Sequence, residues 1–253
     1  MRIVRFSYND QISYGELRGD TVYPITGLPY EGLAFTGEKL PLADVTLLAP
    51  CAPSKVVCVG KNYRDHVAEM ADGTADVPEA PLLFIKPNTC VIGPEEKIVY
   101  PACSERVDYE AELGVVIGKA AHNIAPGTAK DYIFGYTCLN DVTARDIQKR
   151  EGQWTRGKGF DTFCPIGPWI ETALDAQHTG LRSRLNGETR QDSNTENMIH
   201  SIDTLLCVMS ECMTLLPGDV IATGTPAGIG PMQKGDVIEV EIDGIGILRN
   251  TLR

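Results

Sequence analysis

Two glutamates spaced two residues apart could hold a cation. They lie in residues 108–118, DYEAELGVVIG, whose alternating pattern is typical of a half-buried β-strand. One face of this strand would carry Tyr109, Ala111, Leu113, Val115 and Ile117. Glu110 and Glu112 would be neighbours on the other face, where their charges repel unless water or a cation lies close. Solvent exposure is the simpler explanation, and a bound cation is the functional one.

A third acid, Asp141, ends another expected strand, residues 133–141 (IFGYTCLND). If the two strands are neighbours in a sheet, Asp141 can lie beside Glu110 and Glu112. Three converging carboxylates form a hard oxygen site suited to Mg²⁺ or Mn²⁺, with water or substrate completing the coordination shell. The alternative for Asp141 is the N-cap of a helix, because the helix-like residues VTARDIQKRE follow it.

Polar side chains follow Asp141 at helical spacing. If a helix begins at about Val142, Asp141, Arg145 and Gln148 line one side of its first turns. Arg145 would offer a bidentate fork for a carboxylate, and Gln148 an amide for a carbonyl or hydroxyl group. A polar, solvated helix face explains the same spacing.

A histidine and a glutamate lie three residues apart in the segment NYRDHVAEM, which is expected to be helical over residues 64–70. A carboxylate within hydrogen-bond reach orients an imidazole and raises its basicity, the arrangement needed to deprotonate water. His66 and Glu69 are therefore candidates for an acid–base pair. An exposed pair without a catalytic role is the commoner meaning of this spacing.

Two glycine-containing segments could contact an anion. In residues 152–163, GQWTRGKGFDTF, Lys158 could stabilise an oxyanion if it is buried, or it could simply face solvent. Residues 223–230, TGTPAGIG, lack the sequence of a P-loop or of a dinucleotide-binding turn. Their backbone N–H groups and the Thr225 hydroxyl could approach a small anion.

The composition limits the class of protein. The 253 residues carry a formal net charge of -11, from 34 acidic and 23 basic residues, and no Lys/Arg cluster marks a nucleic-acid groove. Neither a signal peptide nor an apolar run of the ~18 residues that a membrane span needs is recognisable, so we expect a cytoplasmic protein without a membrane partner. The eight cysteines form no Cys-x-x-Cys pair and are expected to be reduced core residues. Cys164 as a nucleophile is the alternative.

The expected elements indicate two units. Residues 1–50 alternate short strands (2–6, 13–17 and 21–24) with Gly-rich turns and are expected to form a small N-terminal domain, followed by a catalytic domain over 51–253. The expected strands of the larger unit include 55–60, 82–86, 133–141, 181–185, 188–191, 220–223, 237–242 and 245–248. Strands outnumber helices without regular βαβ alternation, which indicates a β-rich α+β fold with a mostly antiparallel or mixed sheet.

Short sequence signals predict two hairpin turns, one helix and one candidate lid. Asn186-Gly187 and Asp243-Gly244 are hairpin signals between expected strands. Residues 201–215 have the apolar spacing of a core helix. The acidic, Pro-containing loop 73–81 is a candidate lid.

In combination these segments resemble the fumarylacetoacetate hydrolase family. The resemblance runs from Lys55 to the C-terminus through these motifs in family order: VGKNYRDHVAEM, PLLFIKP, DYEAELGVVIGK, GYTCLNDVTARDIQ, KGFDTFCPIGPW, NGETRQ and GDVIATGTPAGIGPM. It implies a mixed β-sandwich roll, usually dimeric, with Mg²⁺, Mn²⁺ or Ca²⁺ as cofactor. The N-terminal unit resembles that of bacterial isomerase/decarboxylases of homoprotocatechuate degradation.

The resemblance assigns roles to residues at matching motif positions. It implies that Glu110, Glu112 and Asp141 are metal ligands. It implies that His66, Glu69 and Lys158 are catalytic. The positions that would contact substrate are Tyr63, Arg145, Gln148, Gly224 and Thr225. The founding hydrolase has a further aspartate ligand shortly before its histidine, where this chain has Lys61-Asn62-Tyr63, so a water molecule is expected in its place.

The family chemistry implies a small 2-oxo acid as substrate. Such an acid can chelate a metal through carboxylate and keto oxygens, and the metal then stabilises an enolate. The expected reaction is C–C hydrolysis of an acylpyruvate-type diketo acid or decarboxylation of oxaloacetate. The alternative is 2-hydroxyhepta-2,4-diene-1,7-dioate isomerase or 5-oxopent-3-ene-1,2,5-tricarboxylate decarboxylase activity in aromatic catabolism. A non-catalytic metal-binding homologue and a cysteine-based hydrolase are hypotheses of other classes, and a homodimer is expected.

Overall fold

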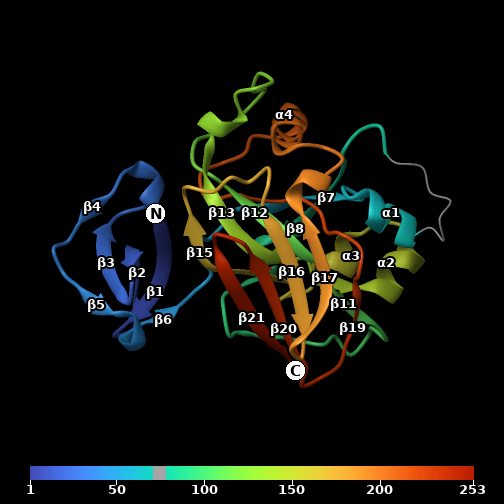
Figure 1. The fold of residues 1–253 in the computed structure, drawn as a ribbon, viewed down its shortest axis with the longest axis horizontal. Helices are drawn as coiled ribbons and strands as arrows, with labels where there is room; N and C mark the ends of the chain where they lie inside the picture. The colour runs from blue at the N-terminus through green and yellow to red at the C-terminus, as the bar shows by residue number, and fades with distance from the viewer. Residues whose placement is uncertain (71–77) are drawn as a thin grey trace.

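The N-terminal strands form an antiparallel meander. The computed structural model describes residues 1–70 and 78–253 (Figure 1). The meander comprises β1 (Arg2–Tyr8), β2 (Gln11–Arg18) and β3 (Thr21–Thr26), with the short strands β4 (Ala34–Phe35), β5 (Leu40–Pro41) and β6 (Thr46–Leu47) beside them. Asn9 and Asp10 have φ of 49° and 62°, which suits the tight turn between β1 and β2. Because β1 also pairs with β15 (Cys164–Glu171), the meander continues into the main sheet.

The main sheet has thirteen strands in the described part of the chain. Its central path runs β4-β3-β2-β1-β15-β13-β12-β18-β7-β8. The members not yet named are β7 (Lys55–Gly60), β8 (Leu82–Pro87), β9 (Val91–Ile92), β12 (Ala111–Ile117), β13 (Ile133–Asn140) and β18 (Val220–Ala222). Most neighbours are antiparallel, but β7 with β18 and β9 with β15 are parallel. The predicted β-rich α+β fold with a mixed sheet is confirmed.

Two smaller sheets complete the β-structure of residues 1–70 and 78–253. One contains β10 (Lys97–Ile98), β16 (Gly180–Leu185), β17 (Glu188–Asn194), β20 (Val237–Ile242) and β21 (Gly246–Leu252). The other contains β11 (Val107–Tyr109), β14 (Thr143–Ala144) and β19 (Gly230–Met232). Both predicted hairpin turns are present, with Leu185 opposite Glu188 and Ile242 opposite Gly246.

Few helices accompany the sheets. The α-helices of the described segments are α1 (Arg64–Met70), α2 (Arg145–Glu151), α3 (Thr155–Lys158) and α4 (Ile202–Cys212), and the 3₁₀ turns are η1 (Pro29–Glu31), η2 (Leu42–Asp44), η3 (Asn88–Cys90), η4 (Ala129–Asp131) and η5 (Thr195–Asn197). Ser201 caps α4 by accepting a hydrogen bond from the Thr204 N–H at 3.2 Å. Apolar side chains of α4 pack on the main sheet, so the predicted core helix is present, although it ends at Cys212. None of these helices has the length and apolar character to cross a bilayer.

Strand β12 is buried on both faces, and the prediction of a half-buried strand is wrong. Leu113 packs against the second sheet, and Val115 packs against α4. On the opposite face, Val116 joins the main core. Because layers cover both sides of this central strand, Glu112 cannot face open solvent and lies in a buried site instead.

The helix after Asp141 begins at Arg145 rather than at Val142. Thr143 and Ala144 instead pair with β11 as strand β14, and Ala144 occupies the N-cap position. Asp141 is therefore not a helix cap. The glycine-containing segment 152–163 contains the short helix α3, and residues 73–77 of the predicted lid lie outside the described residues.

Candidate active site

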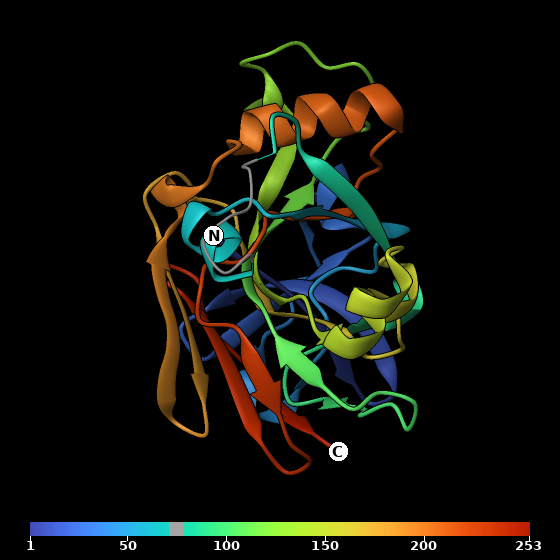
Figure 2. The same ribbon diagram turned by 90° about the vertical axis from the view of Figure 1, so that its right-hand side faces the viewer.

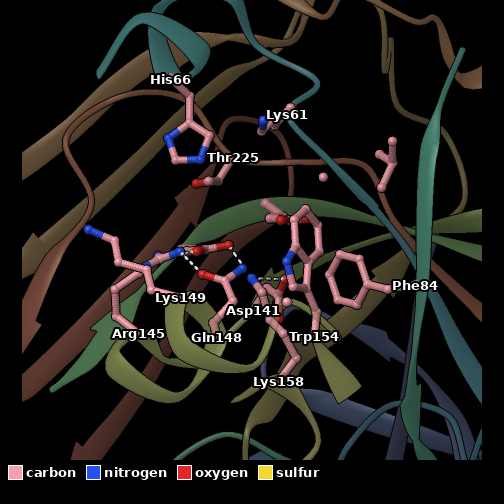
Figure 3. A pocket seen from close by; sticks show the side chains of 15 residues that line it. Lys61, His66, Phe84, Asp141, Arg145, Gln148, Lys149, Trp154, Lys158 and Thr225 are labelled. Atoms are coloured by element: carbon pink, nitrogen blue, oxygen red, sulfur yellow. Dashed lines mark hydrogen bonds and ion pairs between the residues drawn. The ribbon is translucent and has the colours of Figure 1, made fainter. Parts of the chain in front are cut away.

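A cavity of about 230 Å³ is lined by residues of α1, α2 and α3. Figure 2 shows α1 on one side of the molecule and α2 and α3 on the other. Of the residues predicted from the sequence, the cavity brings together His66, Glu110, Glu112, Asp141, Arg145, Gln148, Lys158 and Thr225 (Figure 3). Sites for drug-sized ligands have volumes of about 300–1,000 Å³, so this cavity suits a smaller molecule.

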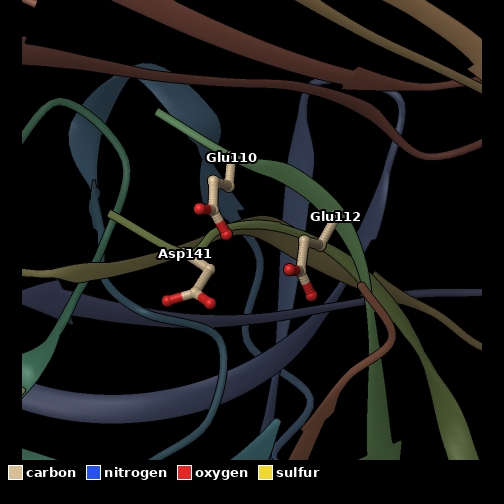
Figure 4. Close-up of side chains that lie close together, drawn as sticks. All are labelled: Glu110, Glu112 and Asp141. Carbon is tan, nitrogen blue, oxygen red and sulfur yellow. The ribbon is translucent and has the colours of Figure 1, made fainter. Parts of the chain in front are cut away.

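Three carboxylates converge at the cavity, as predicted. Ligand oxygens of Glu110, Glu112 and Asp141 lie within 4.8 Å of one another (Figure 4). Antiparallel pairing of β12 with β13 places Ala111 opposite Asn140, and the Asp141 N–H donates to the Glu110 carbonyl at 2.9 Å. The three side chains are almost completely buried, which excludes the explanation by solvent exposure.

Buried cations hold two of these acids. Lys158 Nζ lies 2.7 Å from Glu110 Oε2 and 2.7 Å from Asp141 Oδ2. Lys86 Nζ lies 2.5 Å from the other oxygen of Asp141, and Arg145 forms an ion pair with Glu110. Burial opposes ionisation of Glu110, but Lys158 and Arg145 outweigh it and lower the pKa of this carboxyl group.

Glu112 is the acid that lacks a cation among the described residues. Its carboxylate accepts a hydrogen bond from the Gly224 N–H at 2.7 Å. Burial, together with the charges of Asp141 and Glu110, raises its pKa well above the usual value. The neighbouring buried Asp108 is paired with Arg106 and Arg145, so among the described residues Glu112 is the one of these four acids without a cationic partner. Three converging oxygen ligands, one of them without a cation, fit a divalent metal ion.

Arg145 is held by the protein itself rather than free to clamp a substrate carboxylate. Its Nε donates to Asp108 Oδ2 at 2.9 Å, and Nη1 donates to Gln148 Oε1 at 2.7 Å. With the ion pair to Glu110, the guanidinium group orients a predicted metal ligand. Sequence reasoning assigned no role to Asp108 or Lys86, although a lysine within the apolar strand motif PLLFIKP was a usable signal.

The predicted His66–Glu69 pair is present on α1. His66 Nδ1 lies 3.3 Å from Glu69 Oε2, and Glu69 Oε1 accepts a hydrogen bond from the Gly228 N–H at 3.0 Å. Burial opposes ionisation of Glu69, but the contacts with His66 and Gly228 lower its pKa. The imidazole is buried and faces the cavity (Figure 3). This arrangement can accept and return a proton.

The other predicted contact residues divide into two groups. Thr225 lines the cavity, and its hydroxyl donates to the Ala111 carbonyl at 2.8 Å and accepts from Gln191 Nε2 at 2.7 Å. Gly224 and Tyr63 lie behind the cavity lining, where Gly224 holds Glu112 and Tyr63 is completely buried. Gly224 thus supports a predicted metal ligand from behind the cavity lining.

Cys164 is not placed to act as a nucleophile. It is buried and lies outside the residues that line the cavity. Its hydrogen bond to Cys90, together with burial, raises the pKa of its thiol well above the usual value. A neutral, enclosed thiol is unreactive.

Comparison with known proteins identifies the family. The family model for the fumarylacetoacetate (FAA) hydrolase C-terminal domain matches residues 55–253, and one for an Rv2993c-like N-terminal domain matches residues 1–50. Mitochondrial oxaloacetate tautomerase Fahd2a of Rattus norvegicus is 39% identical over 245 residues, which are 92% of this chain and 76% of that protein.

Solved structures agree with this match over the whole chain. The 5-carboxymethyl-2-hydroxymuconate delta-isomerase of Mycobacterium smegmatis is 46% identical, with a TM-score of 0.93 and coverage of 100% of this chain and 99% of that chain. Maleylpyruvate hydrolase of Sphingobium sp. SYK-6, in complex with manganese(II) and pyruvate, is 31% identical, with a TM-score of 0.80 and coverage of 100% and 98%. This chain is therefore an enzyme of the fumarylacetoacetate hydrolase family.

Proposed function

We propose that this enzyme uses a divalent metal ion, Mg²⁺ or Mn²⁺, to move the C3 proton of small 2-oxo acids, and so interconverts keto and enol forms or double-bond isomers. The observation that carries the proposal is the buried triad of Glu110, Glu112 and Asp141 beside a small cavity, with His66 across from it (Figure 3). The triad provides oxygen ligands for the metal ion, and His66 provides a base.

Each part of the cavity has a task in this reaction. A divalent cation bound to the triad would act as a Lewis acid toward the carboxylate and keto oxygens of the substrate. His66, oriented by Glu69, takes the proton from C3 and returns it after the double bond has moved. Phe84 and Trp154, whose ring centroids are 5.4 Å apart, form an apolar wall that limits access of water to the reactive form.

The named relatives support proton transfer without bond cleavage. One is an oxaloacetate tautomerase and another is a delta-isomerase. Both names describe reactions that move a proton and a double bond and leave the molecular formula of the substrate unchanged. Proton transfer on a metal-bound substrate requires a base beside the metal site. In this chain a base faces the cluster of predicted metal ligands.

Hydrolysis of a diketo acid is a second candidate. It is favoured by the 3.3 Å contact between His66 and Glu69, because an oriented imidazole can also deprotonate a water molecule. Maleylpyruvate hydrolase, a relative by structure, carries that activity in its name. Decarboxylation of oxaloacetate would use the metal site without this base.

One set of assays distinguishes these reactions. The chain is stripped with EDTA, reloaded with Mg²⁺, Mn²⁺ or Ca²⁺, and given the enol form of oxaloacetate, whose ultraviolet absorbance reports tautomerisation. Pyruvate release from oxaloacetate and from acetylpyruvate reports decarboxylation and hydrolysis. We expect metal-dependent tautomerisation to be the fastest of the three and to be lost in Asp141→Asn. Tautomerisation at the buffer rate with every cation would overturn the proposal, and rapid release of pyruvate from acetylpyruvate would then favour hydrolysis.

A further inference from the structure

Lys61 brings a positive charge to the cavity that the proposed chemistry does not use. Arg145 and Lys158 also line the cavity, but carboxylates hold both of them. Lys61 makes no ion pair and no side-chain hydrogen bond with residues 1–70 or 78–253. Its ammonium group is therefore available to an anionic ligand.

The backbone fixes Lys61 in an uncommon conformation. Its φ is 60°, in the left-handed region that residues other than glycine rarely adopt. The next residue, Asn62, is completely buried and holds this conformation through its side chain. Its Nδ2 donates to the carbonyls of His200 at 3.1 Å and Thr223 at 2.8 Å, and its Oδ1 accepts from the His200 N–H at 2.8 Å. Such conformations persist where surrounding contacts impose them, and they concentrate at functional sites.

Lys61 lies on the same wall of the cavity as the proposed base. Figure 3 shows Lys61, His66 and Thr225 together, across the cavity from Arg145 and Lys158. In a four-carbon dicarboxylic 2-oxo acid, the carbon that loses the proton also bears the second carboxylate. With the 2-oxo acid head at the metal ligands, a base for C3 and a cation for that carboxylate must therefore lie side by side.

The overall charge of the chain gives such a local cation a purpose. A net charge of -11 repels a substrate that carries two negative charges. Arg145 and Lys158 are already paired, so they offer little to a second carboxylate. Lys149 also lines the cavity, but it is exposed and lies on the α2 side, away from His66 (Figure 3).

We infer that Lys61 binds the second carboxylate of a dicarboxylic 2-oxo acid and so makes the enzyme select such acids over those with a neutral tail. The inference rests on the proposed function for the position of the 2-oxo acid head. A hydrogen bond between an ammonium group and a carboxylate is charge-assisted, and its loss is expected to reduce discrimination by about 10- to 100-fold.

Oxaloacetate and acetylpyruvate form a matched pair of substrates for kinetics. They share the 2-oxo acid head and the C3 methylene, and they differ in a terminal carboxylate against a terminal acetyl group. For C3 proton transfer, Lys61→Asn should lower kcat/KM about 10- to 100-fold with oxaloacetate and less than about 3-fold with acetylpyruvate. Asparagine tolerates the left-handed backbone, so the variant should fold. Lys61→Arg should retain the preference for oxaloacetate over acetylpyruvate. Lys149→Met should change this preference less than Lys61→Asn does.

Binding of unreactive analogues separates this inference from the proposed function. Malate and 2-hydroxybutanoate share a 2-hydroxy acid head and differ in the far carboxylate, and calorimetry with Mg²⁺ present gives their Kd values. Lys61→Asn should weaken malate binding about 10-fold and leave 2-hydroxybutanoate unchanged. The role of Lys61 would be overturned if Lys61→Asn lowered kcat/KM or affinity equally for both members of a pair, or for neither member. A wild-type enzyme that turns over neither 2-oxo acid but still prefers malate through Lys61 would refute only the proposed function.

Discussion

Nζ of Lys86 lies 2.5 Å from Oδ1 of Asp141, and both side chains are almost completely buried. The lysine also donates to the Val142 carbonyl at 3.0 Å. Burial alone would lower the pKa of an ammonium group, but the charge of Asp141 outweighs it, and the pKa of Lys86 is raised. From behind the cavity lining, Lys86 thus gives a predicted metal ligand a permanent countercharge.

Replacing Lys86 with methionine should destabilise the fold. The substitution leaves Asp141 without one of its buried partners, and breaking such a pair costs about 3–5 kcal/mol. Urea unfolding in EDTA measures the loss, and the exposed Lys234→Met is the matched control, with an expected change below about 0.5 kcal/mol. Equal unfolding free energies for the two variants would contradict the argument.

Two glutamates of the triad should respond oppositely to neutralisation in the metal-free protein. The pKa of Glu112 is raised by burial and by Asp141, so Glu112→Gln should leave the unfolding free energy unchanged or increase it. Glu110→Gln removes one acidic partner from each of Lys158 and Arg145 and should lower the unfolding free energy by about 3 kcal/mol.

Thermal unfolding with and without Mn²⁺ checks both variants. Each should lose the increase in Tm that the metal ion gives the wild-type chain, because each loses a ligand. A Glu112→Gln variant as unstable in EDTA as Glu110→Gln would show that Glu112 is paired in a way that the structure does not contain.

Local signals in the sequence were sufficient to name the three acids as a possible cation site, and the fold then excluded the alternative of solvent exposure. Alternation predicts that Glu110, which directly precedes β12, lies on the same side as Glu112, and Asp141 directly follows β13, which pairs with β12. The hairpin turns at 186–187 and 243–244 were likewise fixed by residues adjacent in the chain. Features of this kind depend on spacing, which the sequence states directly.

Features that depend on packing between layers were not predictable in this way. The burial of both faces of β12 follows from α4 and the second sheet, which lie far away in the sequence. The start of α2 at Arg145 follows from pairing of β14 with β11. For the same reason the links from Asp108 to Arg145 and from Lys86 to Asp141 emerged only from the fold.

Thiol reagents should label two cysteines without loss of activity. Cys103 and Cys212 are exposed, and the other six are buried. Burial raises the pKa of Cys51 and of Cys138 to about 12, so both remain neutral thiols at pH 8. Iodoacetamide labelling followed by peptide mass mapping checks this pattern, and EDTA should abolish activity in the same preparation. Inactivation in step with labelling of Cys164 would support a cysteine-based hydrolase instead.

Glu69→Gln should separate the reactions that need a base from the one that does not. Glu69 orients His66, so its neutralisation should slow acetylpyruvate hydrolysis and oxaloacetate tautomerisation by about 100-fold. Decarboxylation of oxaloacetate, which needs the metal site but no activated water, should fall by less than about 10-fold. The three rates are measured on one metal-loaded preparation, with Glu239→Gln on β20 as the control. Equal losses of rate in all three reactions would show that decarboxylation depends on Glu69 as much as the other two reactions do.

Gly60 permits Trp154 to close the apolar side of the cavity. A Cβ atom added at Gly60 would lie 2.7 Å from Cη2 of Trp154 and still closer to Cζ3. Because the φ of Gly60 is not positive, alanine is compatible with the backbone and the indole ring alone must move. Gly60→Ala should therefore cost about 1–3 kcal/mol of unfolding free energy and lower kcat/KM for tautomerisation by admitting water.

A double-mutant cycle tests this steric cause. In a Trp154→Ala background the added methyl group meets no ring, so Gly60→Ala should be nearly neutral there. The coupling free energy between the two substitutions should equal most of the unfolding free energy that Gly60→Ala costs in the wild-type chain. If the two effects simply add, the cost arises from the backbone of β7, and Trp154 does not depend on the missing side chain at position 60.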